Sequence, residues 1–159
     1  MQKALMLAAS LGIAAYLGVL PLAWAQGHPT AYVPGLGDLM NGSVQPHHIK
    51  LGLAGQNANW ALAGYELDEL REAFEAVAQY QRRWNDKPIA EMQAAIMNPP
   101  LEAVEAAIKA GSREGFVRAY AQVNTGCNSC HLGTERAFVV IRTPVGSPFA
   151  DQEFRPTNR

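Results

Sequence analysis

The sequence predicts an all-α protein, an antiparallel four-helix bundle followed by an extended C-terminal arm. Apolar residues recur at helical spacing in four segments, and turn-forming residues separate those segments. No βαβ unit, internal repeat or second domain is visible. Short connections favour antiparallel neighbours, and the core of such a bundle is a natural place for a cofactor.

Residues 1–25 have the pattern of a cleaved secretory signal peptide. Lys3 is the only charged residue before Asp38, an apolar run over 4–20 follows it, and Ala23-Trp24-Ala25 fits a small-x-small cleavage site before Gln26. The alternative is a retained membrane anchor, because the apolar stretch approaches the roughly 20 residues of a spanning helix. We favour cleavage because glycines and a proline interrupt the stretch.

An exported chain of this kind is expected in the bacterial periplasm, with no stable membrane insertion after cleavage. The chain has 13 Lys and Arg against 14 Asp and Glu, and cleavage removes one of the lysines. Nucleic acid and anionic membranes are not expected partners, since both call for a clustered basic surface.

The first helical segment is expected over residues 36–55, after an N-terminal loop at 26–35 that is rich in turn formers. Gly42 and Pro46 interrupt the segment. The helix is therefore either kinked there or starts afresh at Pro46, with Gln45 as its cap.

The second helix is expected to start near Asn57 or Asn59, which are both good N-cap residues, and to run to about Trp84. Its apolar stripe consists of Trp60, Ala63, Leu67, Leu70, Phe74 and Val77.

The third segment begins at Pro88 and is interrupted at "NPP", where Asn98 can cap a new helix with Pro99 at its first position. That helix is expected to end at Gly111, and Ser112 is expected to cap the fourth helix.

The bundle then covers residues 36–133. Residues 134–159 are β-branched at first and then punctuated by proline, which predicts an extended arm.

The stretch "TGCNSCHLG", residues 125–133, contains the only two cysteines of the chain and His131 directly after the second. Three interpretations compete: a disulfide, a redox-active C-x-x-C pair and a c-type haem attachment site, C-x-x-C-H. A disulfide across two intervening residues would stabilise little, because loop-closure stabilisation grows with loop length. A thioredoxin-like motif needs a strand before it, whereas the apolar residues before Cys127 recur at helical spacing.

Haem attachment gives this spacing a direct rationale. On a helix, Cys127, Cys130 and His131 project from one side. We therefore expect one covalent haem c per chain, held by thioether bonds to Cys127 and Cys130, with His131 on the iron.

A single C-x-x-C-H at the C-terminal end of an exported four-helix bundle resembles the cytochrome c′ family, the class II c-type cytochromes. The resemblance implies that His131 is the proximal iron ligand and that the first helix supplies whatever faces the iron from the other side. It also implies a homodimer through the first two helices. This chain departs from the family in two respects, because Pro46 breaks the first helix and a long segment follows His131. A class I cytochrome fits worse, since the last methionine, Met97, precedes the cysteines.

The sixth position of the iron has two candidate ligands, His48 and Met40, which fall on one face of the first segment. They are about 12 Å apart along a helix, so one iron cannot use both. Methionine at this spacing is more often core, and the alternative for His48 is a partly exposed histidine near a helix start, but histidine is the commonest metal ligand. We favour His48 over Met40, with a five-coordinate iron as a further possibility. Arg136 and Arg142 could pair with haem propionates.

The expected function follows from the number of protein ligands on the iron. Two ligands predict an electron carrier that serves redox partner proteins. One ligand with an open pocket predicts binding of a small gas such as nitric oxide or carbon monoxide. Enzymatic, peroxidase-like chemistry ranks third, because no arginine lies near His48 in sequence to assist it.

Overall fold

Four helical segments make up the computed structural model, which describes residues 31–157. The described residues contain no strand, only an isolated bridge between Trp84 and Lys87. The segments are α1 (Leu36–Leu39), η1 (Met40–Val44) and α2 (Gln45–Gln56), which are continuous with one another, then α3 (Trp60–Tyr80), α4 (Ile89–Lys109) and α5 (Arg113–Gly133). The prediction of an all-α four-helix bundle is confirmed. The predicted signal peptide lies outside the described residues.

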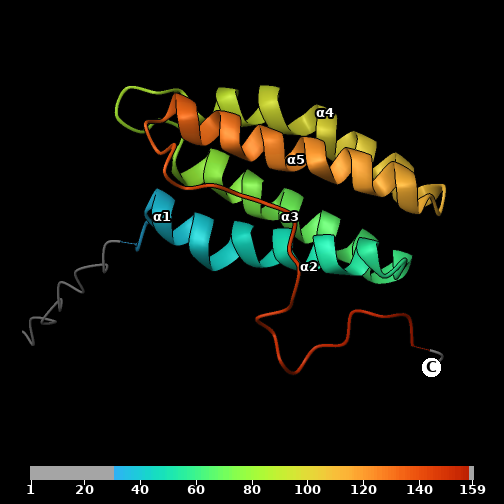
Figure 1. The fold of residues 1–159 in the computed structure, drawn as a ribbon. Coiled ribbons are helices and arrows are strands. Elements are labelled where there is room, and N and C mark those ends of the chain that lie inside the picture. The colour runs from blue at the N-terminus through green and yellow to red at the C-terminus, as the bar shows by residue number, and fades with distance from the viewer. Residues whose placement is uncertain (1–30, 158–159) are drawn as a thin grey trace, which may run out of the picture. The chain divides into compact units, whose positions relative to one another are not determined.

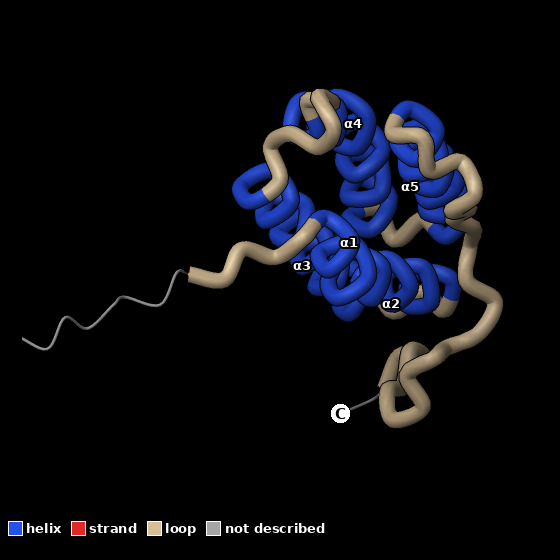
Figure 2. Tube along the Cα trace, turned by 90° about the vertical axis from the view of Figure 1, so that its left-hand side faces the viewer, coloured by secondary structure: helices blue, strands red, loops and turns tan. Residues whose placement is uncertain are grey.

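Successive helices run antiparallel, and the last helix returns to the first (Figure 1). α2 packs on α3, α3 on α4 and α4 on α5, and α5 also contacts α2. Figure 2 shows the four segments around a common interior. The predicted apolar stripe of α3 faces that interior, where Leu67, Leu70 and Val77 are almost fully buried. None of the helices within residues 31–157 is long and apolar enough to cross a bilayer.

Side-chain caps define the starts of α3 and α5. Asn59 Oδ1 accepts a hydrogen bond from the Leu62 amide (3.3 Å), and Ser112 Oγ accepts one from the Gly115 amide (3.1 Å). Each cap satisfies one of the amides that a helix leaves without an internal partner. Both caps are the ones predicted from the sequence, and Asn59 is chosen over Asn57.

α3 ends at Tyr80 rather than near Trp84, so the predicted C-terminal end of this helix is wrong by about one turn. The reason lies in the turn that follows. Asn85 and Asp86 both have positive φ values, 44° and 63°, and the backbones of Trp84 and Lys87 are hydrogen-bonded to each other. This tight turn already includes Trp84, so the helix must stop before it.

The first segment continues through Pro46 and does not start afresh there with Gln45 as its cap. The backbone widens instead into the π-helical stretch η1, in which the Gln45 amide bonds the Met40 carbonyl five residues back. Pro46 has no amide hydrogen to place, so it is tolerated just after the stretch. π-helical turns of this kind are frequent at functional sites, and this one contains Met40 and lies just before His48.

α4 is one helix, and the predicted break at "NPP" is wrong. Pro99 and Pro100 cannot donate to the carbonyls four residues earlier, which normally kinks or ends a helix. Here Met97, Pro100 and Leu101 are buried at helical spacing on the side that faces the core. The burial of that continuous face outweighs two missing backbone hydrogen bonds.

Two glycines let α5 lie close to α2. A Cβ at Gly52 would lie 2.5 Å from the Tyr120 hydroxyl oxygen, and a Cβ at Gly55 would overlap the Phe116 ring. The two aromatic rings, which stack at a centroid distance of 5.6 Å, fill the space that the glycines leave. This contact closes one end of the bundle interior.

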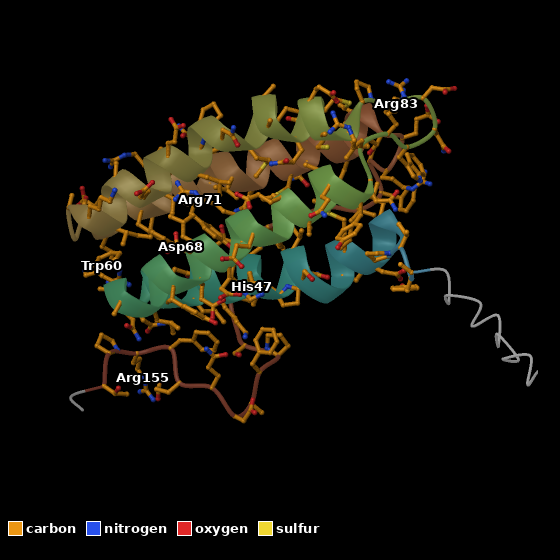
Figure 3. The ribbon with its side chains drawn as sticks, turned by 180° about the vertical axis from the view of Figure 1, so that it is seen from behind. His47, Trp60, Asp68, Arg71, Arg83 and Arg155 are labelled. Carbon is orange, nitrogen blue, oxygen red and sulfur yellow. The ribbon has the colours of Figure 1, made fainter. Side chains whose placement is uncertain are left out.

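The arm after α5 has no regular secondary structure and packs on the bundle. Gln56 Nε2 donates to the Pro144 carbonyl (3.1 Å), and Phe154 is buried. Asn59 Nδ2 donates to the carbonyl of Arg155, which lies beside the start of α3 (Figure 3). The arm therefore crosses from α5 past α2 to α3.

Replacing Pro99 by alanine should raise the free energy of unfolding by about 1–2 kcal/mol. Alanine restores an amide for the Ala95 carbonyl inside a continuous helix, and the gain exceeds the loss of proline's stiffness in the unfolded chain. Urea unfolding followed by circular dichroism measures the change. Glu102→Ala, an exposed change on the same helix, is the control and should have little effect.

The opposite result is expected if a new helix begins at Pro99. Proline is favoured at a first helical position, so Pro99→Ala would then be neutral or destabilising, and α4 would not be continuous.

Candidate functional site

The C-x-x-C-H motif occupies the last turns of α5, where the helix lies close to α4. Gly126 makes this approach possible, because a Cβ there would lie 2.9 Å from Met97 Sδ and 3.2 Å from Ile96 Cγ2. Cys127 directly follows this glycine, Cys130 lies one helical turn after it, and both cysteines are partly buried. The close packing therefore turns the motif toward the bundle interior.

A cavity of about 190 Å³ lies beside the motif and is lined by all four helical segments and the arm. It brings together the predicted attachment residues and iron ligands: Met40, His48, Cys127, Cys130 and His131. The rest of its wall is mainly apolar and includes Val44, Phe74, Ile89, Met97, Val139 and Ile141. The residues come from sequence positions far apart, so the fold itself assembles this constellation.

A second cavity of about 420 Å³ adjoins the first, and both are lined by Met40, Cys130 and His131. Arg136 and Trp84 lie in its wall, with the guanidinium 4.4 Å from the centre of the indole ring. Arg136 is therefore placed to meet an anionic group at the rim of an otherwise apolar space. Arg142 lines a different hollow, beside His48 and the arm.

Both cysteines are free thiols in the structure. Burial, with the neighbouring Cys130 as a smaller cause, raises the pKa of Cys127 to about 12, and burial also raises the pKa of Cys130. Redox-active C-x-x-C pairs instead need a thiol with a lowered pKa, commonly at a helix N-terminus. These thiols lie near a helix C-terminus in an apolar environment, so their surroundings do not favour thiol–disulfide exchange.

The imidazole of His131 is oriented by the arm. Its Nδ1 lies 2.7 Å from the carbonyl oxygen of Val139. A carbonyl can only accept, so this bond places the proton of the neutral ring on Nδ1 and leaves the lone pair on Nε2. A backbone carbonyl on the other ring nitrogen is the usual partner of a metal-ligating histidine.

The imidazole of His48 is buried, and protein groups contact both of its nitrogens. Nε2 lies 2.8 Å from Asn124 Oδ1, and Nδ1 lies 3.1 Å from the Tyr120 hydroxyl. That hydroxyl also donates to the His48 backbone carbonyl (2.7 Å). Burial lowers the pKa of His48, against a smaller opposing effect of Asn124. The ring is therefore held neutral, with Nε2 donating to Asn124.

Met40 and the remaining histidines occupy different environments. Met40 is half-buried and lines both cavities. His47 lies where α2 meets α3 (Figure 3), and its Nδ1 is 2.8 Å from the buried carboxylate of Glu66. His47 therefore contacts α3 and lies away from the cavity, and His28 lies outside the described residues.

Sequence reasoning missed Asn124 and Asn128, whose amides hold the arm on α5. Asn124 Nδ2 donates to Thr143 Oγ1, and Asn128 bonds the backbone of Ile141. Their spacing could have indicated this role, because Asn124, Asn128 and His131 form one polar row on α5 at positions i, i+4 and i+7.

Comparison of the chain with protein-family models, characterised proteins and solved structures found no match. The functional proposal for this chain therefore depends on its own residues and geometry.

The residues of the site fit a covalently attached haem. Two thiols and an imidazole with a free Nε2 line one apolar space, and an arginine lies at the rim of the adjoining one. The first cavity alone is smaller than the roughly 300–1,000 Å³ of ordinary ligand pockets, so both cavities would be needed. Among residues 31–157, no group of three or more His, Cys, Asp or Glu side chains is arranged to hold a bare metal ion.

Replacing Tyr120 by phenylalanine should destabilise the protein by about 1–3 kcal/mol, because the buried His48 carbonyl loses its donor and His48 Nδ1 loses its polar neighbour. Chemical unfolding measures the loss. Tyr80→Phe, at the exposed end of α3, should cost little. Equal effects of the two changes would mean that the hydroxyl of Tyr120 does not hold His48.

Proposed function

We propose that this chain is an exported, periplasmic monohaem c-type cytochrome that transfers electrons. The observation that carries the proposal is the convergence of Cys127, Cys130 and His131 on one apolar cavity in the bundle interior. The raised thiol pKa of Cys127 supports it, because it argues against the redox-active alternative.

Each residue of the motif has a separate role in this proposal. Cys127 and Cys130 would hold the haem through thioether bonds, and His131 would bind the iron through Nε2. When bound, the haem supplies a one-electron redox centre whose potential depends on ligands, burial and hydrogen bonds. The mainly apolar wall suits the face of a macrocycle, and Arg136 offers a positive charge for a propionate.

His48 is the proposed second iron ligand, and its environment already meets one requirement. Only a neutral imidazole can donate a lone pair, and burial holds His48 in that form. Ligation through Nε2 would replace its bond to Asn124, whereas Met40 would give up no hydrogen bond. Met40 is therefore the alternative ligand.

A specific contact favours a second candidate function, the binding of a small gas. If His48 keeps both of its hydrogen-bond partners, it does not reach the iron, and one side of the cavity stays open beside Val44 and Phe74. An apolar pocket beside a five-coordinate iron would bind nitric oxide or carbon monoxide. In either case, we propose that the physiological partners include redox proteins of the same compartment.

The first experiment tests covalent attachment on the full-length protein, expressed in a bacterium that can mature c-type cytochromes. Acidic acetone should leave the haem on the polypeptide, because thioether bonds survive the extraction. Cys127→Ala/Cys130→Ala should release any bound haem to the organic phase. Ser129→Ala, a change between the two cysteines, should behave like the wild type.

The attachment proposal would be wrong if the wild-type chain released its haem into acetone or bound none. Retention of haem by the double cysteine variant would show that other residues hold it.

The second experiment identifies the distal ligand by optical and electron paramagnetic resonance spectra. If His48 binds the iron, the ferric and ferrous proteins should both be low-spin and react slowly with carbon monoxide. His48→Ala should then give a high-spin protein that binds carbon monoxide quickly, while Met40→Ala and His47→Ala should leave the spectra nearly unchanged.

Two other results would reject His48 as the ligand. Conversion to high spin in Met40→Ala alone would assign the ligand to Met40 and keep electron transfer. A wild-type protein that is already high-spin and reacts rapidly with carbon monoxide would place gas binding first.

A further inference from the structure

The arm after α5 is paired with one row of polar side chains on that helix. His131 Nδ1 donates to the Val139 carbonyl (2.7 Å), and Asn124 Nδ2 donates to Thr143 Oγ1 (2.9 Å). Between these two contacts, Asn128 bonds the arm residue Ile141. The contacting residues of α5 are spaced by about one helical turn. On the arm, every second residue makes a contact.

The two spacings match because of elementary geometry. Three or four residues of α-helix rise about 4.5–6 Å, and two residues of extended chain span about 6.6 Å. An extended arm running antiparallel to α5 can therefore present every second residue to successive turns of the helix. A slip of one residue would turn the wrong side of the arm toward the helix.

The side chain of Asn128 fixes the register of the arm on α5. Its Oδ1 accepts from the Ile141 amide (2.8 Å), and its Nδ2 donates to the Ile141 carbonyl (2.9 Å). Both bonds go to the backbone of one residue, so the carboxamide holds that residue from two sides. Ile141 itself lines the cavity, and Val139, two residues earlier, bonds His131.

We infer that the arm is a positioning strap for His131 and that Asn128, inside the C-x-x-C-H motif, is its positioning residue. Asn128 sets the register of the arm, and the register places the Val139 carbonyl on His131 Nδ1. This inference rests on the proposed function, since it assigns His131 to the iron. It goes further because it gives one of the two intervening motif residues and the arm a role in tuning that ligand.

The expected effect on the proposed iron site follows from the chemistry of imidazole. A carbonyl that accepts from Nδ1–H makes the ring a stronger donor at Nε2 and fixes its orientation. A stronger donor stabilises ferric over ferrous iron. Loss of the strap should therefore raise the reduction potential without removing the haem.

The test compares Asn128→Ala with Ser129→Ala in the full-length, matured protein. Ser129 is the other intervening motif residue, and its hydroxyl bonds only the Thr125 carbonyl of the same helix. Asn128→Ala should keep covalent haem and raise the potential by up to about 59 mV, a tenfold change in the ferric-to-ferrous equilibrium. Ser129→Ala should match the wild type. Asn128→Asp keeps the acceptor for the Ile141 amide and should give a smaller rise.

A second readout follows the proton on His131 by ¹⁵N nuclear magnetic resonance. In the wild type and in Ser129→Ala, the His131 Nδ1–H should exchange slowly with water. In Asn128→Ala, the same proton should exchange quickly. If Asn128→Ala does not fold, Asn128→Asp is compared with Ser129→Ala in its place. An unchanged potential together with an unchanged Nδ1–H signal would overturn the inference.

The two possible failures can be told apart. A wild-type chain without covalent haem would contradict the proposed function, and the Nδ1–H signal of His131 would still test the strap. A haem-bearing wild type with no effect of Asn128→Ala on either readout would contradict the strap alone.

Discussion

The close packing of α5 against α2 and α4 is the constraint on which the rest of the structure depends. Tyr120 occupies the space over Gly52, and Gly126 lies against Met97, so a side chain at either glycine would have to displace these neighbours. At the Gly52 end, the aromatic rings fill the interior. At the Gly126 end, the last turns of α5 face a cavity that all four helical segments line. The same packing thus stabilises one end of the bundle and leaves space for a ligand at the other.

Polar contacts connect the two sides of this cavity in a single path. His48, from the first helical segment, bonds Asn124 on α5, and Asn124 in turn holds Thr143 of the arm. The last turns of α5 therefore fix both the buried imidazole on one side and the strap that orients His131 on the other. Buried polar groups need partners, and here those partners also order the arm. Exchange of the bond between His48 and Asn124 for a bond to iron would release an amide that also anchors the arm, so the two sides of the site are coupled.

Local sequence signals predicted the parts of the fold that depend on single residues. The caps Asn59 and Ser112 and the apolar stripe of α3 could be read directly, since their physical basis is local. The continuity of α4 through Pro99 could not, because burial of a continuous helical face overrides a local preference that is worth about 3 kcal/mol. The sequence also indicated the motif and both distal candidates. The strap escaped prediction, since it depends on the pairing of Asn128 with a residue of an irregular segment.

The central claim, that this chain carries one covalent haem on its two cysteines, is tested most directly by the intact mass of the purified protein under denaturing conditions. Covalent attachment predicts a single species at the mass of the processed chain plus one haem. A mass equal to the bare polypeptide, with either two free thiols or a disulfide between Cys127 and Cys130, would contradict it.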